Sequence, residues 1–332
     1  MGSGAQRPAE ASATPSPTAS APTGASTGGV AVPHRYTTAV FPLPAGSGPH
    51  DVAPASDGTV WYTGQRSGEM GRLDPKTGTV QRIPLGSGSA PHGVIVGPDG
   101  AAWVTDGGLN ASVRVTAAGE VKKYPLPANR PGANLNTATF DGRGRLWFTG
   151  QAGVYGVLDT ATSAMQVFDA PRGAGPYGIA TAPNGDVYYS SLAGSYLAKV
   201  DLDKQTVTVL DPPTAKGGAR RVWSDSAGRM WISEWFSGRL GRFEPDGGRW
   251  REWPLPGSGA QPYAMYVDET DTVWLSDFGA NTLVWFDPRT EQFGSVPLPK
   301  PNAAVRQILG RPSEVWGAMS GADALIVVRP TP

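Results

Sequence analysis

The chain has 332 residues, enough for one or two domains, and combines 45 Gly and 32 Pro with 11 Trp. Its 28 basic residues balance 28 acidic ones, which argues against a nucleic acid or an anionic membrane as partner, and we expect no transmembrane segment because no run of 18 apolar residues occurs. The lack of Cys excludes disulfides, Cys-ligated zinc and thiol nucleophiles.

Residues 1–34 form the first segment and consist mostly of Ala, Pro, Ser, Thr and Gly. Such a segment cannot bury enough apolar surface to offset the entropy lost on ordering, so we predict a disordered linker here and a folded domain over 35–332. The segment lacks the apolar core of a signal peptide. A tether of this composition before a folded domain indicates an exported protein, at the cell envelope or outside the cell. A native N-terminus that merely lacks a signal remains the alternative.

A repeated unit begins at Tyr36. Each unit carries an aromatic anchor within a strand-like run, and successive anchors are about 42 residues apart. The anchors are Trp61, Trp103, Trp147, Tyr188, Trp231, Trp274 and Trp316. This period with strand signals predicts an all-β protein, a seven-bladed β-propeller with four-stranded antiparallel blades. Because the anchors recur with the repeat, we expect them to pack between neighbouring blades.

The second unit shows how each blade divides into four strands. We expect them at His92–Val96, Ala102–Thr105, Ser112–Thr116 and Glu120–Tyr124. An Asp-Gly pair between the first two strands is a strong hairpin signal. Several fourth strands end in Pro-Leu-Pro, and proline is tolerated there because the outermost strand of a blade can spare a backbone donor.

The two ends of the repeated region complement each other. The last unit stops at Val328, after its third strand, whereas Tyr36–Pro44 resembles a fourth strand with no unit before it. We therefore predict that Tyr36–Pro44 completes the last blade and closes the ring, which removes open sheet edges.

Hairpin symmetry predicts which side chains surround the channel. His92 and Asp106 are symmetric about the turn, so we expect them to lie opposite each other. The first strand of a propeller blade is its innermost, so the equivalent pairs should ring one mouth of the channel, where variation on a repeated scaffold favours a binding site. The pairs are His50–Gly64, His92–Asp106, Asn136–Gly150, Tyr177–Ser191, Arg220–Glu234, Tyr263–Asp277 and Val305–Met319.

The repeats GPHDVAPASDGTVWYTG, APHGVIVGPDGAAWVTD and GPYGIATAPNGDVYYSS, with the GRLGRF strand, resemble the virginiamycin B lyase (streptogramin lyase) family. The resemblance covers roughly Tyr36 to Val328. It implies a propeller that opens a cyclic depsipeptide at its ester by elimination, with a His as general base and Mg²⁺ polarising the substrate. It also implies an assisting His on the preceding blade and Glu residues near the mouth.

The family pattern assigns roles to individual residues. His92, in Pro-His-Gly, matches the base, and His50, one blade earlier, matches the assisting His. Asp106 stands where the family has a Glu, which implies a metal ligand. Ala90 and Asn136 stand where the family has a Glu and a Tyr. The His-bearing blades are the last two in the lyases and the first two here.

The remaining polar mouth residues are candidates for binding the substrate: Asn136, Tyr177, Arg220, Glu234, Tyr263 and Asp277. Plainer interpretations stand beside these roles. His92 with Asp106 is either a base with its carboxylate or a cross-strand contact that fixes the hairpin, and Arg220 with Glu234 favours a cross-strand ion pair over a substrate clamp.

Three functions follow. The first is a lyase of the streptogramin type. The second is a non-catalytic extracellular propeller that binds a ligand or protein. The third is a metal-dependent lactonase-type hydrolase, whose ligands would be Asp106, Asn136, Glu234 and Asp277. In each case we expect a monomer with a small-molecule or peptide ligand at the channel mouth.

Overall fold

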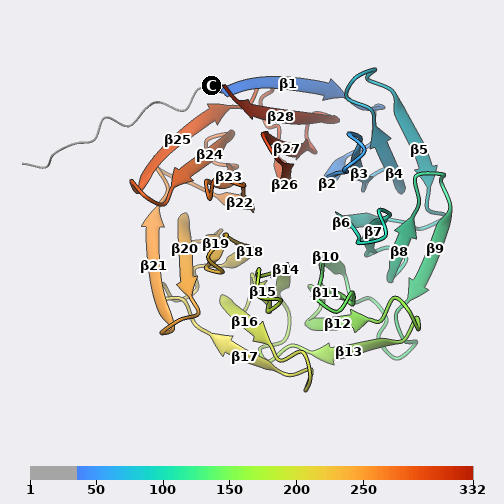
Figure 1. Ribbon diagram of the computed structural model, residues 1–332, viewed down its shortest axis with the longest axis horizontal. Helices are drawn as coiled ribbons and strands as arrows, with labels where there is room; N and C mark the ends of the chain where they lie inside the picture. Colours follow the sequence, from blue (N-terminus) through green and yellow to red (C-terminus); the bar gives the residue numbers. More distant parts are fainter. Residues whose placement is uncertain (1–35, 332) are drawn as a thin grey trace, which may run out of the picture. The chain divides into compact units, whose positions relative to one another are not determined.

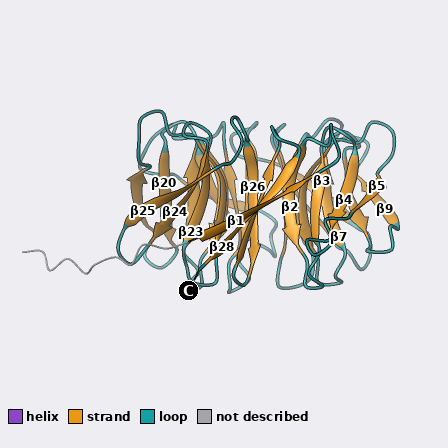
Figure 2. Cartoon of the chain, turned by 90° about the horizontal axis from the view of Figure 1, so that it is seen from above, coloured by secondary structure: helices purple, strands orange, loops and turns teal. Residues whose placement is uncertain are grey.

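The computed structural model describes residues 36–331, which fold into a ring of seven β-sheets (Figure 1). Each sheet has four antiparallel strands, so the predicted all-β, seven-bladed propeller is confirmed. Seen from the side, the strands run between two faces that carry the loops (Figure 2). Within 36–331, no helix is long and apolar enough to cross a membrane. The linker predicted for 1–34 lies outside the described residues and stays a prediction.

The first four blades follow one another along the chain, each built from the innermost to the outermost strand. Their strands are β2 (Pro49–Pro54), β3 (Val60–Gly64), β4 (Glu69–Leu73) and β5 (Val80–Pro84); β6 (Pro91–Val96), β7 (Ala102–Asp106), β8 (Ala111–Val115) and β9 (Val121–Pro125); β10 (Leu135–Phe140), β11 (Leu146–Gly150), β12 (Val154–Leu158) and β13 (Met165–Asp169); and β14 (Pro176–Thr181), β15 (Val187–Ser191), β16 (Tyr196–Val200) and β17 (Val207–Leu210).

The last three blades repeat this order with one exception. Their strands are β18 (Ala219–Ser224), β19 (Met230–Glu234), β20 (Arg239–Glu244) and β21 (Arg249–Pro254); β22 (Pro262–Val267), β23 (Val273–Asp277), β24 (Thr282–Asp287) and β25 (Gln292–Pro297); and β26 (Val305–Arg311), β27 (Glu314–Met319), β28 (Ala324–Pro330) and β1 (Tyr36–Pro42). The seventh blade therefore takes its outermost strand from the start of the described chain.

The pairing of β1 with β28 is antiparallel and runs from Tyr36 opposite Pro330 to Pro42 opposite Ala324. The strand ends two residues before the predicted Pro44, and the backbone N–H of Leu43 donates to the carbonyl of Asp323. In Figure 1, β1 lies along the outside of β28.

The hydrophobic core of the described residues consists of seven clusters, each shared by two neighbouring blades. Every cluster contains one aromatic anchor, at most 3% exposed, so the predicted packing between blades is confirmed. In cluster order the anchors are Trp274, Trp61, Trp103, Trp147, Trp316, Tyr188 and Trp231. Burial of one such ring in each contact joins successive blades.

Acidic residues in the turns between the first two strands fix several anchors. The indole N–H of Trp147 donates to Asp141 at 2.8 Å, and that carboxylate also accepts backbone N–H groups of its own turn. Trp231 and Trp274 donate to the equivalent Asp225 and Asp268, both at 2.8 Å. The turn residue therefore closes the hairpin and orients the ring that packs between blades.

A β-bulge interrupts the start of every innermost strand. In β6, Pro91 rather than His92 lies opposite Asp106, and the register then shifts before Gly93 pairs with Thr105. The predicted pairing of His92 with Asp106 is thus wrong by one residue, because hairpin symmetry assumes an unbroken ladder. A bulge leaves a residue outside the ladder and re-aims its side chain.

The seventh blade needs a further correction. In the first blade, nine residues separate the paired residues Val52 and Tyr62. In the seventh blade, eight residues separate the equivalent pair, Ile308 and Gly317, so the seventh hairpin is shorter by one residue. Val305 does lie opposite Met319, as predicted. The residue equivalent to His50 is nevertheless Arg306, and an arginine takes the place of the predicted valine at the channel mouth.

Candidate functional site

One end of the central channel is formed where the seven innermost strands begin. We call it the histidine mouth and define it by the first residues after each strand start: His50, His92, Asn136, Tyr177, Arg220, Tyr263 and Arg306. The innermost strands surround the centre of the ring in Figure 1. The structure therefore brings together the predicted His, Asn, Tyr and Arg residues of different blades.

His50 and His92 lie against each other on the neighbouring strands β2 and β6. Their ring centroids are 3.7 Å apart, and the ring planes are inclined by 42°. His50 is 2% exposed and His92 is 6% exposed. Burial lowers the pKa of both imidazoles well below the usual value, and arginine charges add to the effect at His50. Both rings are therefore neutral at pH 7.

The hydrogen bonds of the two rings determine where their protons lie. Nδ1 of His92 is 3.0 Å from the backbone carbonyl of Asn136, which can only accept, so this nitrogen carries the proton. Nδ1 of His50 is 2.7 Å from Oδ1 of Asp51 and likewise donates to it. Within residues 36–331 no hydrogen bond engages Nε2 of either ring. Each neutral imidazole thus keeps its Nε2 lone pair available to accept a proton.

Behind the histidines lies a buried charge network. Arg221, 3% exposed, places Nη2 3.0 Å from Oδ1 of Asp51, and Nη1 donates to Oγ1 of Thr137 at 2.6 Å. Burial raises the pKa of Asp51, whereas the charge of Arg221 opposes that rise. Three blades are therefore tied across the channel by one guanidinium, and the carboxylate that it holds orients the ring of His50.

Asp51 is the residue of the candidate site that sequence reasoning missed. Its position follows His50 directly, whereas the equivalent residues in three other repeats are Gly93, Gly178 and Ala264. A carboxylate at a position where these three repeats carry a small residue was the available signal. The prediction assigned the supporting carboxylate to Asp106 instead, because it relied on the regular hairpin register.

The aromatic side of the histidine mouth is formed by Tyr177 and Tyr263, whose hydroxyl oxygens are 2.5 Å apart. Arg220 lies between them, with its guanidinium carbon 3.5 Å from the ring centroid of Tyr263 and Nη2 2.9 Å from the hydroxyl of Tyr177. Burial raises the pKa of Tyr177. Burial also acts to raise the pKa of Tyr263, but the charges of Arg220 and Arg221 outweigh it and leave that pKa below its usual value.

These tyrosines also border the histidines. The ring centroid of Tyr177 is 6.0 Å from that of His92, and that of Tyr263 is 6.5 Å from that of His50. Arg306 reaches the same group, with Nη1 3.4 Å from the hydroxyl of Tyr263. The mouth is thus closely packed, with more arginine than carboxylate charge around the histidine pair.

The strand-end carboxylates occupy a different environment. Asp106 accepts hydrogen bonds from the hydroxyl of Ser89 at 2.5 Å and from the backbone N–H groups of Ala90 and Leu109, both at 2.9 Å. Asp277 likewise accepts from the N–H groups of Gln261 and Gly279. These carboxylates fix the loops between strands: both oxygens of Asp106 accept hydrogen bonds from its own loops, and Oδ1 of Asp277 accepts both of the bonds to that residue.

Glu234 and Arg220 do not form the expected cross-strand ion pair within the described chain. Oε2 of Glu234 accepts from Ser237 at 2.8 Å, whereas Arg220 contacts the tyrosines. Burial raises the pKa of Glu234 to about 7, and the neighbouring charge of Glu252 adds to the rise. Asn136 contributes its backbone carbonyl to His92, while its side-chain oxygen accepts from Thr137 at 2.8 Å.

The donor set at the mouth does not fit a magnesium ion. Among residues 36–331, the cluster able to hold a metal is His50, Asp51 and His92, whose ligand atoms lie within 4.8 Å of one another. It offers two imidazoles and one carboxylate, whereas Mg²⁺ prefers a shell of oxygen ligands. Moreover, the guanidinium of Arg221 already occupies Oδ1 of Asp51. The predicted Mg²⁺ therefore lacks an oxygen cage built by these side chains.

Most of the sequence matches a known protein family. The model of the virginiamycin B lyase family matches residues 23–276. The chain belongs to the virginiamycin B lyase family. A virginiamycin B lyase of Nocardia farcinica is 31% identical over 226 residues, which are 68% of this chain and 76% of that protein.

Solved structures share the fold of this family member. Virginiamycin B lyase from Staphylococcus aureus superposes with a TM-score of 0.83 at 19% identity, covering 90% of this chain and 100% of the other. A streptogramin B lyase gives 0.82 at 21% identity, covering 89% and 98%. A catalytically inactive variant of the S. aureus enzyme has been solved with quinupristin and gives the same 0.83.

Proposed function

We propose that the protein is a lyase that opens a cyclic ester, such as a depsipeptide ring, by elimination, with His92 as the general base. The observation that carries the proposal is the pair of neutral histidines whose Nδ1 protons are fixed by Asn136 and Asp51. Each ring thereby keeps an unprotonated Nε2 that can accept a proton. Membership of the virginiamycin B lyase family supports the same reaction class.

The reaction needs one proton transfer and no water. Nε2 of His92 takes the proton from the carbon next to a substrate carbonyl. The electrons of that C–H bond form a carbon–carbon double bond, the ester C–O bond on the next carbon breaks, and the ester carboxylate leaves with its electrons. The lowered pKa of His92 keeps the imidazole unprotonated before the transfer, and the nearby charge of Asp51 stabilises the imidazolium that results.

The arginines supply the positive charge that the reaction requires. Negative charge develops on the substrate carbonyl oxygen and on the leaving carboxylate, and fixed positive groups in a water-poor site stabilise it. Arg220 and Arg306 lie on both sides of Tyr263 at the mouth. We assign the stabilisation of this negative charge to the two arginines. A requirement for Mg²⁺ remains a prediction, which assays with added Mg²⁺ or with EDTA test.

Access to the histidines requires a rearrangement. Both rings are less than one-tenth exposed, and Tyr177 and Tyr263 bridge the mouth beside them through their hydroxyls. A substrate ester would displace this hydroxyl contact and receive hydrogen bonds from the same groups. Tyr177, Tyr263 and Arg220 therefore bind the substrate in the proposal, whereas Asn136 positions His92 through its carbonyl.

The decisive experiment measures ring opening of a streptogramin B antibiotic by mass spectrometry. His92→Ala should lower kcat/KM by about 10²–10⁴-fold, the usual contribution of a general base. His34→Ala is the matched control, since it removes the third His of the chain, outside the described residues, and should retain full activity. Elimination gives a product of unchanged mass, whereas hydrolysis adds one water.

Two results would reject the proposal. The first is that the wild-type protein opens no ring, with or without Mg²⁺. The second candidate, a non-catalytic binding propeller, would then replace the lyase, and the hydroxyl contact that bridges Tyr177 and Tyr263 favours that candidate. A product heavier by one water would indicate a hydrolase. The lactonase ligands predicted from sequence receive no support, because Asp106 and Asp277 each bond to their own loops. Export and the monomeric state remain predictions.

A further inference from the structure

A cavity of about 630 Å³ lies at the other end of the channel, where the innermost strands end. Its volume is in the range of small-molecule sites. At about 3.3 Å per strand residue, Pro54 lies about 13 Å along β2 from His50, so this cavity is separate from the histidine site. We call it the tryptophan mouth and define it by Pro54, Ile95, Phe140, Trp223, Tyr266 and Leu309.

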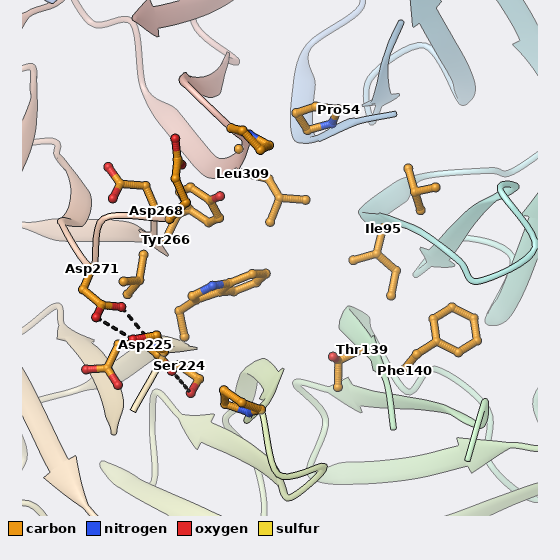
Figure 3. Close-up of a pocket in the computed structure, with 18 residues that line it drawn as sticks. Pro54, Ile95, Thr139, Phe140, Ser224, Asp225, Tyr266, Asp268, Asp271 and Leu309 are labelled. Carbon is orange, nitrogen blue, oxygen red and sulfur yellow. Dashed lines mark hydrogen bonds between the residues drawn. The ribbon is translucent and has the colours of Figure 1, made fainter. Parts of the chain in front are cut away.

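The aromatic residues of the tryptophan mouth gather on neighbouring blades. Trp223 on β18 and Tyr266 on β22 meet edge to face, with ring centroids 5.5 Å apart. The equivalent position carries Ala53 in the first blade and Ala180 in the fourth, so most of the repeats have no such ring. In Figure 3, Tyr266 lies on one side of the cavity, with Ile95 and Phe140 on the other. The cavity therefore offers one wall built on the Trp223–Tyr266 pair and a second, apolar wall with Ile95 and Phe140.

The rim of this cavity carries an excess of negative charge. The lining includes the carboxylates of Asp225, Asp268, Glu269 and Asp271 and no Lys, Arg or His. Asp225 pairs with Arg229. Within residues 36–331 the other three form no ion pair, and their hydrogen bonds come from uncharged donors. Asp268 and Asp271 lie on the same side of the cavity as Tyr266 (Figure 3).

We propose that the tryptophan mouth binds an organic cation with an aromatic or apolar body. The carboxylates would attract the cationic group, the faces of Trp223 and Tyr266 would add cation–π attraction, and Ile95 and Phe140 would contact the apolar body. The proposal concerns the face opposite the histidine pair and does not depend on lyase activity.

Three naphthalenes of matched size test the chemistry: 1-naphthylmethylamine, 1-naphthalenemethanol and 1-naphthoate. Saturation-transfer NMR titrations with the full chain measure their affinities. The amine should bind about tenfold more tightly than the naphthoate at low salt, with the neutral alcohol between them, and added salt should narrow this difference.

Variants locate the site. The double variant Glu269→Gln with Asp271→Asn should lower the affinity for the amine about five- to tenfold and leave the affinity for the alcohol unchanged. Trp223→Ala should lower the affinity for the amine and for the alcohol. Trp223→Phe keeps an aromatic ring, should retain most of the binding, and serves as the check that the fold is intact. Glu120→Gln with Asp246→Asn removes two exposed charges elsewhere, and His92→Ala alters the other mouth; both should have no effect.

The proposal fails if the three compounds bind equally, if none binds, or if Trp223→Ala leaves binding unchanged. It also fails if His92→Ala lowers amine binding as much as Trp223→Ala does, which would move the ligand to the histidine mouth. Sedimentation equilibrium tests whether a second copy of the chain fills the cavity instead. A wild-type dimer that dissociates in the Trp223→Ala variant would show this and overturn the proposal.

Discussion

The two mouths of the channel are built from the two ends of the same seven strands, yet they differ in packing and in charge. The histidine mouth is filled by buried side chains, and Arg220, Arg221 and Arg306 surround a histidine pair that contacts one carboxylate, Asp51. The tryptophan mouth holds an open cavity whose lining has carboxylates and no basic residue. The repeat therefore fixes the blades but leaves each strand end free to carry its own chemistry.

The backbone explains part of this difference. At the histidine mouth each innermost strand begins with a bulge, as in the shift between Pro91 and Gly93. At the tryptophan mouth the same strand pairs regularly, from Val94 opposite Val104 to Val96 opposite Ala102. Bulges re-aim side chains, and here they accompany a cluster that meets in the channel. Regular pairing accompanies the cavity at the other end.

The largest expected effect concerns the buried pair at the histidine mouth. Asp51→Asn leaves Arg221 buried without a counter-charge, so the free energy of unfolding should fall by about 3–5 kcal/mol. Urea denaturation measures the loss.

The double variant Asp51→Asn with Arg221→Met is the control, since it removes both charges and should recover most of the stability. A single variant as stable as the wild type would show that the pair does not hold this mouth together.

Glu234 provides a pH test of the same mouth. Because its folded-state pKa is raised to about 7, above the unfolded value, its protonated form stabilises the fold at low pH. This contribution to the free energy of unfolding is about 3 kcal/mol at most. It is fully present below about pH 4.5 and is lost as the pH rises through about 7. Glu234→Gln should flatten that part of the stability profile, measured by urea denaturation from pH 4.5 to 8.5.

The comparison needs a control at the other mouth. Glu269→Gln makes the same substitution at the tryptophan mouth and controls for the loss of a carboxylate away from Glu234. If Glu234→Gln retains the wild-type slope between pH 5 and 8, the carboxyl group of Glu234 does not titrate there.

The smallest expected effect concerns the tyrosine bridge. Tyr263→Phe removes the hydroxyl contact with Tyr177 and should cost about 1 kcal/mol of stability. In an ultraviolet absorbance titration, the wild type should show one tyrosine that ionises below the ordinary pKa of 10.0, and this step should disappear in Tyr263→Phe.

Tyr155→Phe is the matched variant, because the pKa of Tyr155 is raised and its loss should leave the early step in place. Persistence of that step in Tyr263→Phe would assign it to another tyrosine and remove the proposed influence of the arginines.

The sequence was sufficient to predict the blades and insufficient to predict the site network. A fixed period, Asp-Gly turns and aromatic anchors are local signals that recur, so the strands and the packing of residues such as Trp147 could be predicted. The bulges could not, because they are small departures from the ladder without a sequence signature in the repeat. The predicted cross-strand partners at the mouth were therefore misplaced by one residue in the first six blades, and only Val305 with Met319 was correct.

The partner of Asp51 was also beyond local reasoning. Arg221 lies 170 residues away along the chain, and only the closed arrangement of the first and fifth blades brings the two together. His50 and His92 were predicted as neighbours because they follow one another by one repeat. Their tautomers, by contrast, depend on the carbonyl of Asn136 and on Asp51, which no repeat alignment places.

The pairing of β1 with β28 has a consequence for how the protein forms. The seventh blade joins the first described strand to the last, so its contacts have the greatest separation along the chain. Loop closure over such a distance is entropically slow, and the strand made first on the ribosome must wait for the strand made last. During synthesis the half-built seventh blade exposes an unpaired edge, which is the stage at which the chain is most prone to pair with another copy.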